Sequence, residues 1–134
     1  MSYKVSVPII SENVWRQGKE LLFEQLRELD AERVFLAVGC YKLDGEERAK
    51  MLAELKENCE YFHAQGLEVG TWLWSFMFEQ EPPFTHMRLV KEHEEDCRMD
   101  ACPLDEGFLA FSGEYLQFSF SSANILARSS PSSL

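Results

Sequence analysis

The stretch Arg33 to Val38, RVFLAV, decides the fold prediction. It is a nearly uninterrupted apolar run that ends at Gly39. It lacks the strict alternation of apolar and polar residues that is typical of a strand with one face exposed to solvent. Continuous apolar sequence of this length is typical of a strand buried on both faces, as in a parallel sheet covered by helices. The segment therefore predicts a buried parallel strand.

Two further strand-like segments flank this one. Lys4 to Ile10, KVSVPII, is a short β-branched run, and Leu67 to Phe78, LEVGTWLWSFMF, contains a third strand and the start of the loop beyond it. Strands thus begin near residues 4, 33 and 67, a spacing of about 30 residues that suits a strand plus its crossover helix. The predicted fold is α/β, a partial TIM-barrel-like parallel sheet with about three βα units and no barrel closure.

Three helices are predicted between and after the strands. The first runs from about Glu12 to Asp30 with Ser11 as N-cap. The second begins with the capping pair Asp44 and Glu47 and stops at Gly66. The third starts after 102–105, where Pro103 and Asp105 suit a helix start, and runs to about Gln117. The apolar positions expected to be buried are Val14, Leu21, Leu22, Leu26 and Leu29 in the first, Met51, Leu52, Leu55, Cys59 and Phe62 in the second, and Phe108, Phe111, Tyr115 and Leu116 in the third.

The regular alternation of predicted strands and helices stops in the last third of the chain. Residues 82–100 are predicted to be an excursion with a short strand at 87–90. Residues 1–117 form the N-terminal portion of a (β/α)8-type barrel in this prediction, and 118–134 form a Ser-rich tail. Seven of the last 17 residues are serine and none is acidic. This composition indicates a disordered tail, or a non-native one produced by truncation or a reading-frame shift near Gln117.

Charge and composition exclude several classes of protein. The chain has 134 residues and a formal net charge of −10, from 23 acidic and 13 basic residues. Such a surface repels phosphate backbones and anionic headgroups, so we expect no nucleic-acid partner and no membrane partner. No targeting segment or membrane span is recognisable, and the chain is expected to be cytoplasmic. The four cysteines, Cys40, Cys59, Cys97 and Cys102, are expected to be reduced thiols.

Aromatic residues at the end of the third strand are the most informative candidates for a site. In parallel α/β folds ligands bind at the carboxyl ends of the strands. Trp72, Trp74 and Phe76 share one face there because side chains alternate along a strand. Aromatic platforms suit carbohydrate, whose C–H face packs on a ring. The alternative is that these rings fill the barrel core or pack under a helix.

The sequence gives weaker support for a catalytic pair of carboxylates, a metal site or a nucleotide-binding motif. Glycosidic hydrolysis needs two facing carboxyl groups about 5–10 Å apart, and the candidates near the strand ends are Glu12, Asp44, Glu79 and Glu81, none with a spacing that indicates convergence. The pairs Cys59/His63 and His93/Cys97 have helical spacing but lack a metal-binding motif. No metal and no cofactor are predicted. The chain contains no P-loop, no GxGxxG and no GxSxG.

Four segments carry a resemblance to a known family: VSVPIISENVW, RVFLAVG, GLEVGTWLWSF and ACPLDEGFLAFSGEYL. Over about residues 3–117 the sequence resembles the N-terminal part of bacterial barrel proteins described as glycoside hydrolases. The resemblance implies a (β/α)8 barrel acting on a carbohydrate ligand, with Tyr41, Trp72 and Trp74 on the substrate side. In the retaining glycosidases the catalytic acids belong to the fourth and seventh strands, so the catalytic residues are unknown here.

Three functions follow from these observations. The first is a fragment of a glycoside-hydrolase-like barrel that is inactive as this chain. The second is part of a sugar isomerase or epimerase barrel. The third is a small, non-catalytic α/β interaction module that self-associates through exposed sheet edges.

Overall fold

The computed structural model describes residues 3–38, 42–73, 77–78, 80–89 and 98–128. Its main sheet has three parallel strands, β1 (Ser6–Ile10), β2 (Arg33–Val38) and β3 (Glu68–Leu73), in the order β1-β2-β3. The predicted α/β class, the parallel sheet and the positions of its three strands are confirmed. Among the described residues the sheet stays open and does not close into a barrel.

The first connection contains two helices, α1 (Ser11–Gln17) and α2 (Lys19–Glu28), so the prediction of one continuous helix is wrong. The break falls at Gly18, whose φ of +85° lies outside the helical range of L side chains. Leu21 and Leu29 are exposed although they were expected to be buried: Leu22 and Leu26 are the buried residues of α2, and Leu29 is its C-cap residue.

Ser11 also differs from its prediction as an N-cap. The cap position is Ile10, and Ser11 is the first residue of α1. Its hydroxyl instead donates to the carbonyl oxygen of Ala37 at 2.9 Å. The side chain therefore ties the end of β1 to the end of β2 rather than satisfying an amide of its own helix.

The second connection matches its predicted boundaries. α3 (Gly45–Ala64) is capped by Asp44, whose carboxylate accepts from the amides of Glu46 and Glu47 at 3.0 and 2.9 Å. Gly66 follows the helix with a φ of +88°, the left-handed conformation that ends it. The predicted buried stripe is confirmed at Leu55, Cys59 and Phe62.

A small antiparallel sheet forms the excursion after β3. It contains β4 (Met77–Phe78), β5 (His86–Leu89) and β6 (Arg98–Ala101) in the order β4-β6-β5. The predicted short strand at 87–90 corresponds to β5. β4 and β6 were not predicted, since neither has a long β-branched run.

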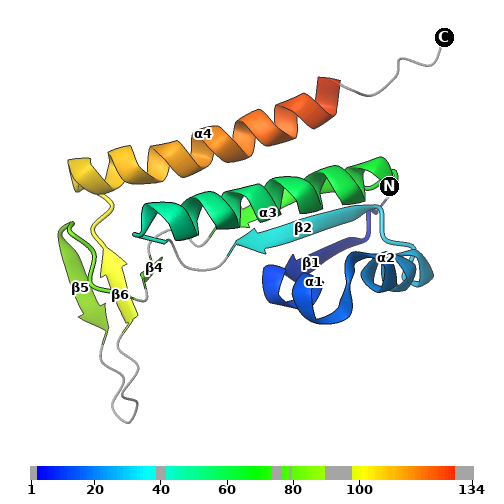
Figure 1. The fold of residues 1–134 in the computed structure, drawn as a ribbon, viewed down its shortest axis with the longest axis horizontal. Coiled ribbons are helices and arrows are strands. Elements are labelled where there is room, and N and C mark those ends of the chain that lie inside the picture. The colour runs from blue at the N-terminus through cyan, green and yellow to red at the C-terminus, as the bar shows by residue number, and fades with distance from the viewer. Residues whose placement is uncertain (1–2, 39–41, 74–76, 79, 90–97, 129–134) are drawn as a thin grey trace.

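The last helix, α4 (Glu106–Arg128), passes well beyond the end predicted at Gln117. Its start is capped by Asp105, whose carboxylate accepts from the amides of Phe108 and Thr85 at 3.0 Å each. α4 runs alongside α3, and the antiparallel pair of β5 and β6 lies at the end of the molecule where α4 begins (Figure 1). Phe108 and Tyr115 are buried as predicted, whereas Leu116 is exposed.

The helices cover one face of the parallel sheet. Ile9, Val34 and Leu36 point to this side, and they form one buried cluster with residues of the three helices α1, α2 and α3. A second cluster, rich in aromatic residues, joins the small sheet to α4 and α3. The opposite face of the parallel sheet, here called the open face, consists of Ser6, Pro8, Ile10, Arg33, Phe35, Ala37, Glu68, Gly70 and Trp72.

Candidate functional site

The carboxyl end of the open face is an apolar row that crosses all three strands. Ile10 pairs with Ala37 and Ala37 pairs with Trp72 in the parallel register. Ile10 is 56% exposed and Trp72 is 55% exposed, while Ala37 between them is buried. Neighbouring strands lie about 4.8 Å apart, so the two exposed side chains start roughly 10 Å apart on either side of a methyl group. This row is the candidate ligand-binding surface.

The next row toward the amino end is closely packed. Phe35 of β2 pairs with Gly70 of β3, and a β-carbon built on Gly70 would lie 2.6 Å from two atoms of the Phe35 ring. The ring therefore occupies the space that a side chain at position 70 would need. A glycine inside a strand often marks such a close approach, and this is the signal in the sequence that could have revealed the contact.

The predicted site residues have different outcomes. Trp72 lies at the carboxyl end of β3, on the open face of the sheet, and is 55% exposed among the described residues. Tyr41 and Trp74 lie outside the described residues, as does Phe76. The structure adds Ile10 to the candidate surface. The sequence predicted only that Ile10 lies at the end of a strand, not that it shares a row with Trp72.

A hydrogen-bond pair fixes the backbone of Lys42, two residues before Asp44. The hydroxyl of Tyr115, on α4, accepts from the amide of Lys42 and donates to its carbonyl oxygen, both at 3.2 Å. Tyr115 is fully buried. Sequence reasoning predicted Tyr115 as a core residue but not this contact, because 73 positions separate the two residues along the chain.

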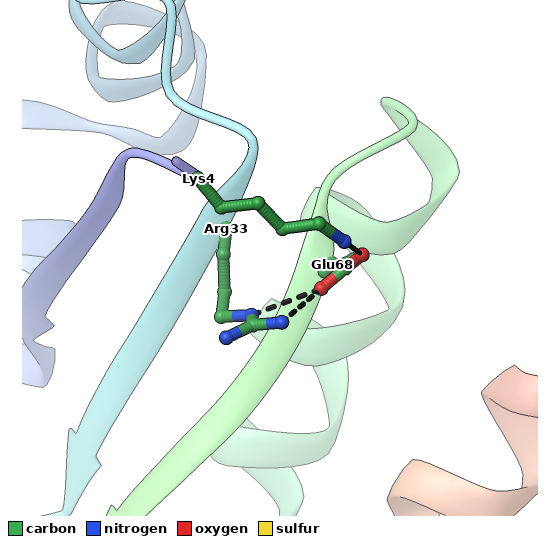
Figure 2. A network of polar contacts seen from close by, with 3 residues as sticks. All are labelled: Lys4, Arg33 and Glu68. Carbon is green, nitrogen blue, oxygen red and sulfur yellow. Dashed lines mark hydrogen bonds and ion pairs between the residues drawn. The ribbon is translucent and has the colours of Figure 1, made fainter. Parts of the chain in front are cut away.

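The amino end of the open face is polar. Figure 2 shows that the carboxylate of Glu68 faces two cations, Lys4 and Arg33. Arg33 donates through Nε at 2.9 Å and through Nη2 at 2.5 Å, and Lys4 contacts the other oxygen. The hydrogen bonds from Lys4 and Arg33 hold the pKa of Glu68 below its usual value. The open face thus changes from charged to apolar along the strands.

The four carboxylates predicted near the site do not form a described pair. Asp44 caps α3, and Glu81 lies 3.6 Å from Nε2 of His86 in the small sheet. The side chain of Glu12 and all of Glu79 lie outside the described part of the chain. No two of these groups are therefore brought together in the residues that the structure describes.

The cysteines have no metal-binding surroundings among the described residues. Cys59 is buried, and burial, with a smaller contribution from the charge of Glu60, raises the pKa of its thiol to about 11. Cys102 is half-buried and free. Cys40 and Cys97 lie outside the described residues.

Two searches of the chain, one for membrane-spanning helices in its described residues and one for similar proteins, found nothing. Within the described residues, no helix combines the length and apolar character that crossing a membrane requires. No protein-family profile, curated protein or solved structure matches this chain. The site must therefore be interpreted from its own geometry.

Proposed function

We propose that this chain is a fragment of a carbohydrate-active, glycoside-hydrolase-like barrel protein. It contributes part of the ligand-binding surface and is inactive as a separate chain. One observation carries the proposal: Trp72 is 55% exposed at the carboxyl end of a parallel strand, on the face that no described helix covers. Ligands of parallel α/β proteins bind at this end of the strands.

The chemistry of the apolar row suits a sugar ring. A ligand that covers an exposed indole removes apolar surface from water, and each Å² of apolar area buried stabilises the complex by about 25 cal/mol. The C–H face of a pyranose covers such a ring while its hydroxyls remain in water. Ile10 extends the apolar surface on the other side of Ala37, so the row offers contact wider than a single side chain.

The carboxylates described on the open face support a binding role better than hydrolysis. Hydrolysis requires one carboxyl group to donate a proton and a second to act from the other side. In the described residues the open face contains one carboxylate, Glu68, at the amino end of the strands. Its two cationic partners favour the ionised form, so it is a poor proton donor.

The test is a titration with neutral mono- and oligosaccharides, followed through the indole N–H signal of Trp72 in an NMR spectrum. We expect a saturable shift of that signal in the wild type and in Leu104→Ala. Since Trp72→Ala has no such signal, its binding is followed by calorimetry, and we expect no saturable binding of the sugar to this variant. Leu104 is a matched control because it is apolar and 84% exposed, but lies in the turn before α4. Saturable binding that survives Trp72→Ala, or no shift with any sugar, would contradict the proposal.

A further inference from the structure

The two edges of the parallel sheet differ in their ability to accept another strand. At β1, the carbonyl oxygen of Val5 accepts from the amides of Glu32 and Arg33, so the backbone groups of residues 5, 7 and 9 face β2. The backbone groups of Ser6, Pro8 and Ile10 consequently face outward. Proline has no amide hydrogen, and its place at the centre of this row removes a donor that an added strand would need.

The edge at β3 has no such block. The amide of Glu68 donates to the carbonyl oxygen of Glu32, so residues 68, 70 and 72 direct their backbone groups toward β2. Val69, Thr71 and Leu73 direct theirs outward, and each has both a donor and an acceptor. Among the described residues, β3 pairs with β2 alone.

We propose that two copies of this chain associate through their β3 edges, in antiparallel orientation, to form a closed dimer with a continuous six-stranded sheet. A two-fold axis makes the contact self-complementary. Because Pro8 then lies on both outer edges, the sheet cannot grow further by the same means. One blocked edge and one open edge thus favour a dimer over a fibre. The inference does not depend on sugar binding.

The side chains of β3 favour one register. With Thr71 opposite Thr71 of the second copy, residues 69, 71 and 73 form the hydrogen-bonded pairs. Trp72 then stands opposite Gly70 of the second copy in a non-hydrogen-bonded pair, where side chains approach most closely. Gly70 has no side chain, and the ring of Phe35 lies beside it. The second copy therefore contributes Phe35 to the surface around Trp72.

Charge modulates this contact without preventing it. The formal net charge of −10 on each chain opposes association, but the acidic side chain of β3, Glu68, is already paired with Lys4 and Arg33. The repulsion is therefore long-range and is screened by salt. We expect the dimer to be tighter at high ionic strength than at low ionic strength.

Analytical ultracentrifugation of the full chain, without sugar, tests the proposal. We expect twice the 15.5 kDa mass of the chain at high concentration. Thr71→Pro removes the central outward donor of β3 but no hydrogen bond to β2, and it should sediment as a monomer. Ser6→Pro is the matched control at an outward position of β1 and should remain a dimer. Pro8→Val restores the missing donor and should give species larger than a dimer.

Amide exchange of the wild-type chain covers the case in which a proline variant fails to fold. The amides of Val69 and Thr71 should exchange more slowly at high than at low protein concentration, while the amide of Ser6 should not change. A wild-type monomer at all concentrations, a folded Thr71→Pro dimer, or concentration-independent exchange at Val69 and Thr71 would overturn the proposal.

Discussion

The ring of Phe35 lies against the backbone of Gly70 on the neighbouring strand, in the space where any other residue would place its β-carbon. The contact links β2 to β3 across the open face, in the row next to Trp72. It also makes position 70 the most sterically restricted glycine among those described, since a β-carbon added at any of the others would meet no atom closer than 3.1 Å.

Replacement of Gly70 by alanine should destabilise the chain. The new methyl group would lie 2.6 Å from Cδ1 and Cε1 of Phe35, so the ring or the strand must move. Overpacking of this kind costs about 1–3 kcal/mol. Urea unfolding monitored by circular dichroism measures the change. Gly45→Ala is the control, because no atom lies within 4 Å of the added carbon, and an equal loss of stability in both variants would contradict the steric explanation.

Acid should weaken the network around Glu68. Its pKa is lowered in the folded protein by Lys4 and Arg33, so the folded state binds a proton less readily than the unfolded state. The resulting stabilisation is present above the unfolded pKa, near 4.5, and is lost as the pH falls through the lower, folded value. Melting temperatures of the wild type and Glu68→Gln should therefore differ at neutral pH and converge in acid.

High salt supplies a second comparison for the same network. The three side chains are partly exposed, with side-chain accessibilities of 44% for Lys4, 37% for Arg33 and 48% for Glu68. Ions screen exposed pairs, so the difference between wild type and Glu68→Gln at neutral pH should also shrink in molar salt. A difference that is independent of both pH and salt would show that packing, rather than charge, explains the effect of the substitution.

Removal of the Tyr115 hydroxyl should destabilise the chain without emptying the core. Tyr115→Phe keeps the buried ring but leaves the amide and carbonyl of Lys42 without this partner. The loss of a buried hydrogen-bonding group costs about 1–3 kcal/mol. Tyr61→Phe is the matched control, because Tyr61 is half-buried and its described contacts are made by its ring. Equal unfolding free energies for Tyr115→Phe and the wild type would contradict the prediction.

The thiol of Cys59 should resist alkylation. Burial raises its pKa to about 11, so little thiolate is present at pH 8 and the reagent has no access. Cys102, which is half-buried, should react before Cys59. Peptide mass spectrometry after a short iodoacetamide pulse separates the two sites. Comparable labelling of Cys59 and Cys102 in the native protein would contradict the buried position of Cys59. Labelling of Cys59 that appears only after denaturation would agree with it.

Local signals in the sequence predicted the parts of the fold that local chemistry determines. Asp44 and Gly66 bound α3 as expected, because a side-chain cap and a left-handed glycine act within one turn of the chain. The strand at Arg33–Val38 was recognisable from its apolar run. Gly18 was missed as a break because a glycine is tolerated inside many helices, and its backbone conformation depends on the packing of both flanking helices.

Long-range contacts explain what the sequence did not reveal. The apolar run of β2 predicted burial on both faces, but in the described residues α1, α2 and α3 pack on one face only. The run is apolar on both sides of the strand, so it could not reveal which face the helices leave open. For the candidate site, Trp72 was predicted from strand periodicity, whereas its neighbour across the sheet, Ile10, depends on the register of three strands. The end of α4 was misplaced because its serine-rich continuation resembles a tail.

The order of the strands in the main sheet also has a consequence for how the chain folds. Each strand pairs with the one that precedes it in the sequence: Ser6 with Arg33, a separation of 33 − 6 = 27 residues, and Arg33 with Glu68, a separation of 68 − 33 = 35 residues. The entropy of closing a loop grows only with the logarithm of its length, so the two closures cost nearly the same. During synthesis, β1 and β2 can pair before β3 leaves the ribosome, and the sheet can grow in the direction of translation.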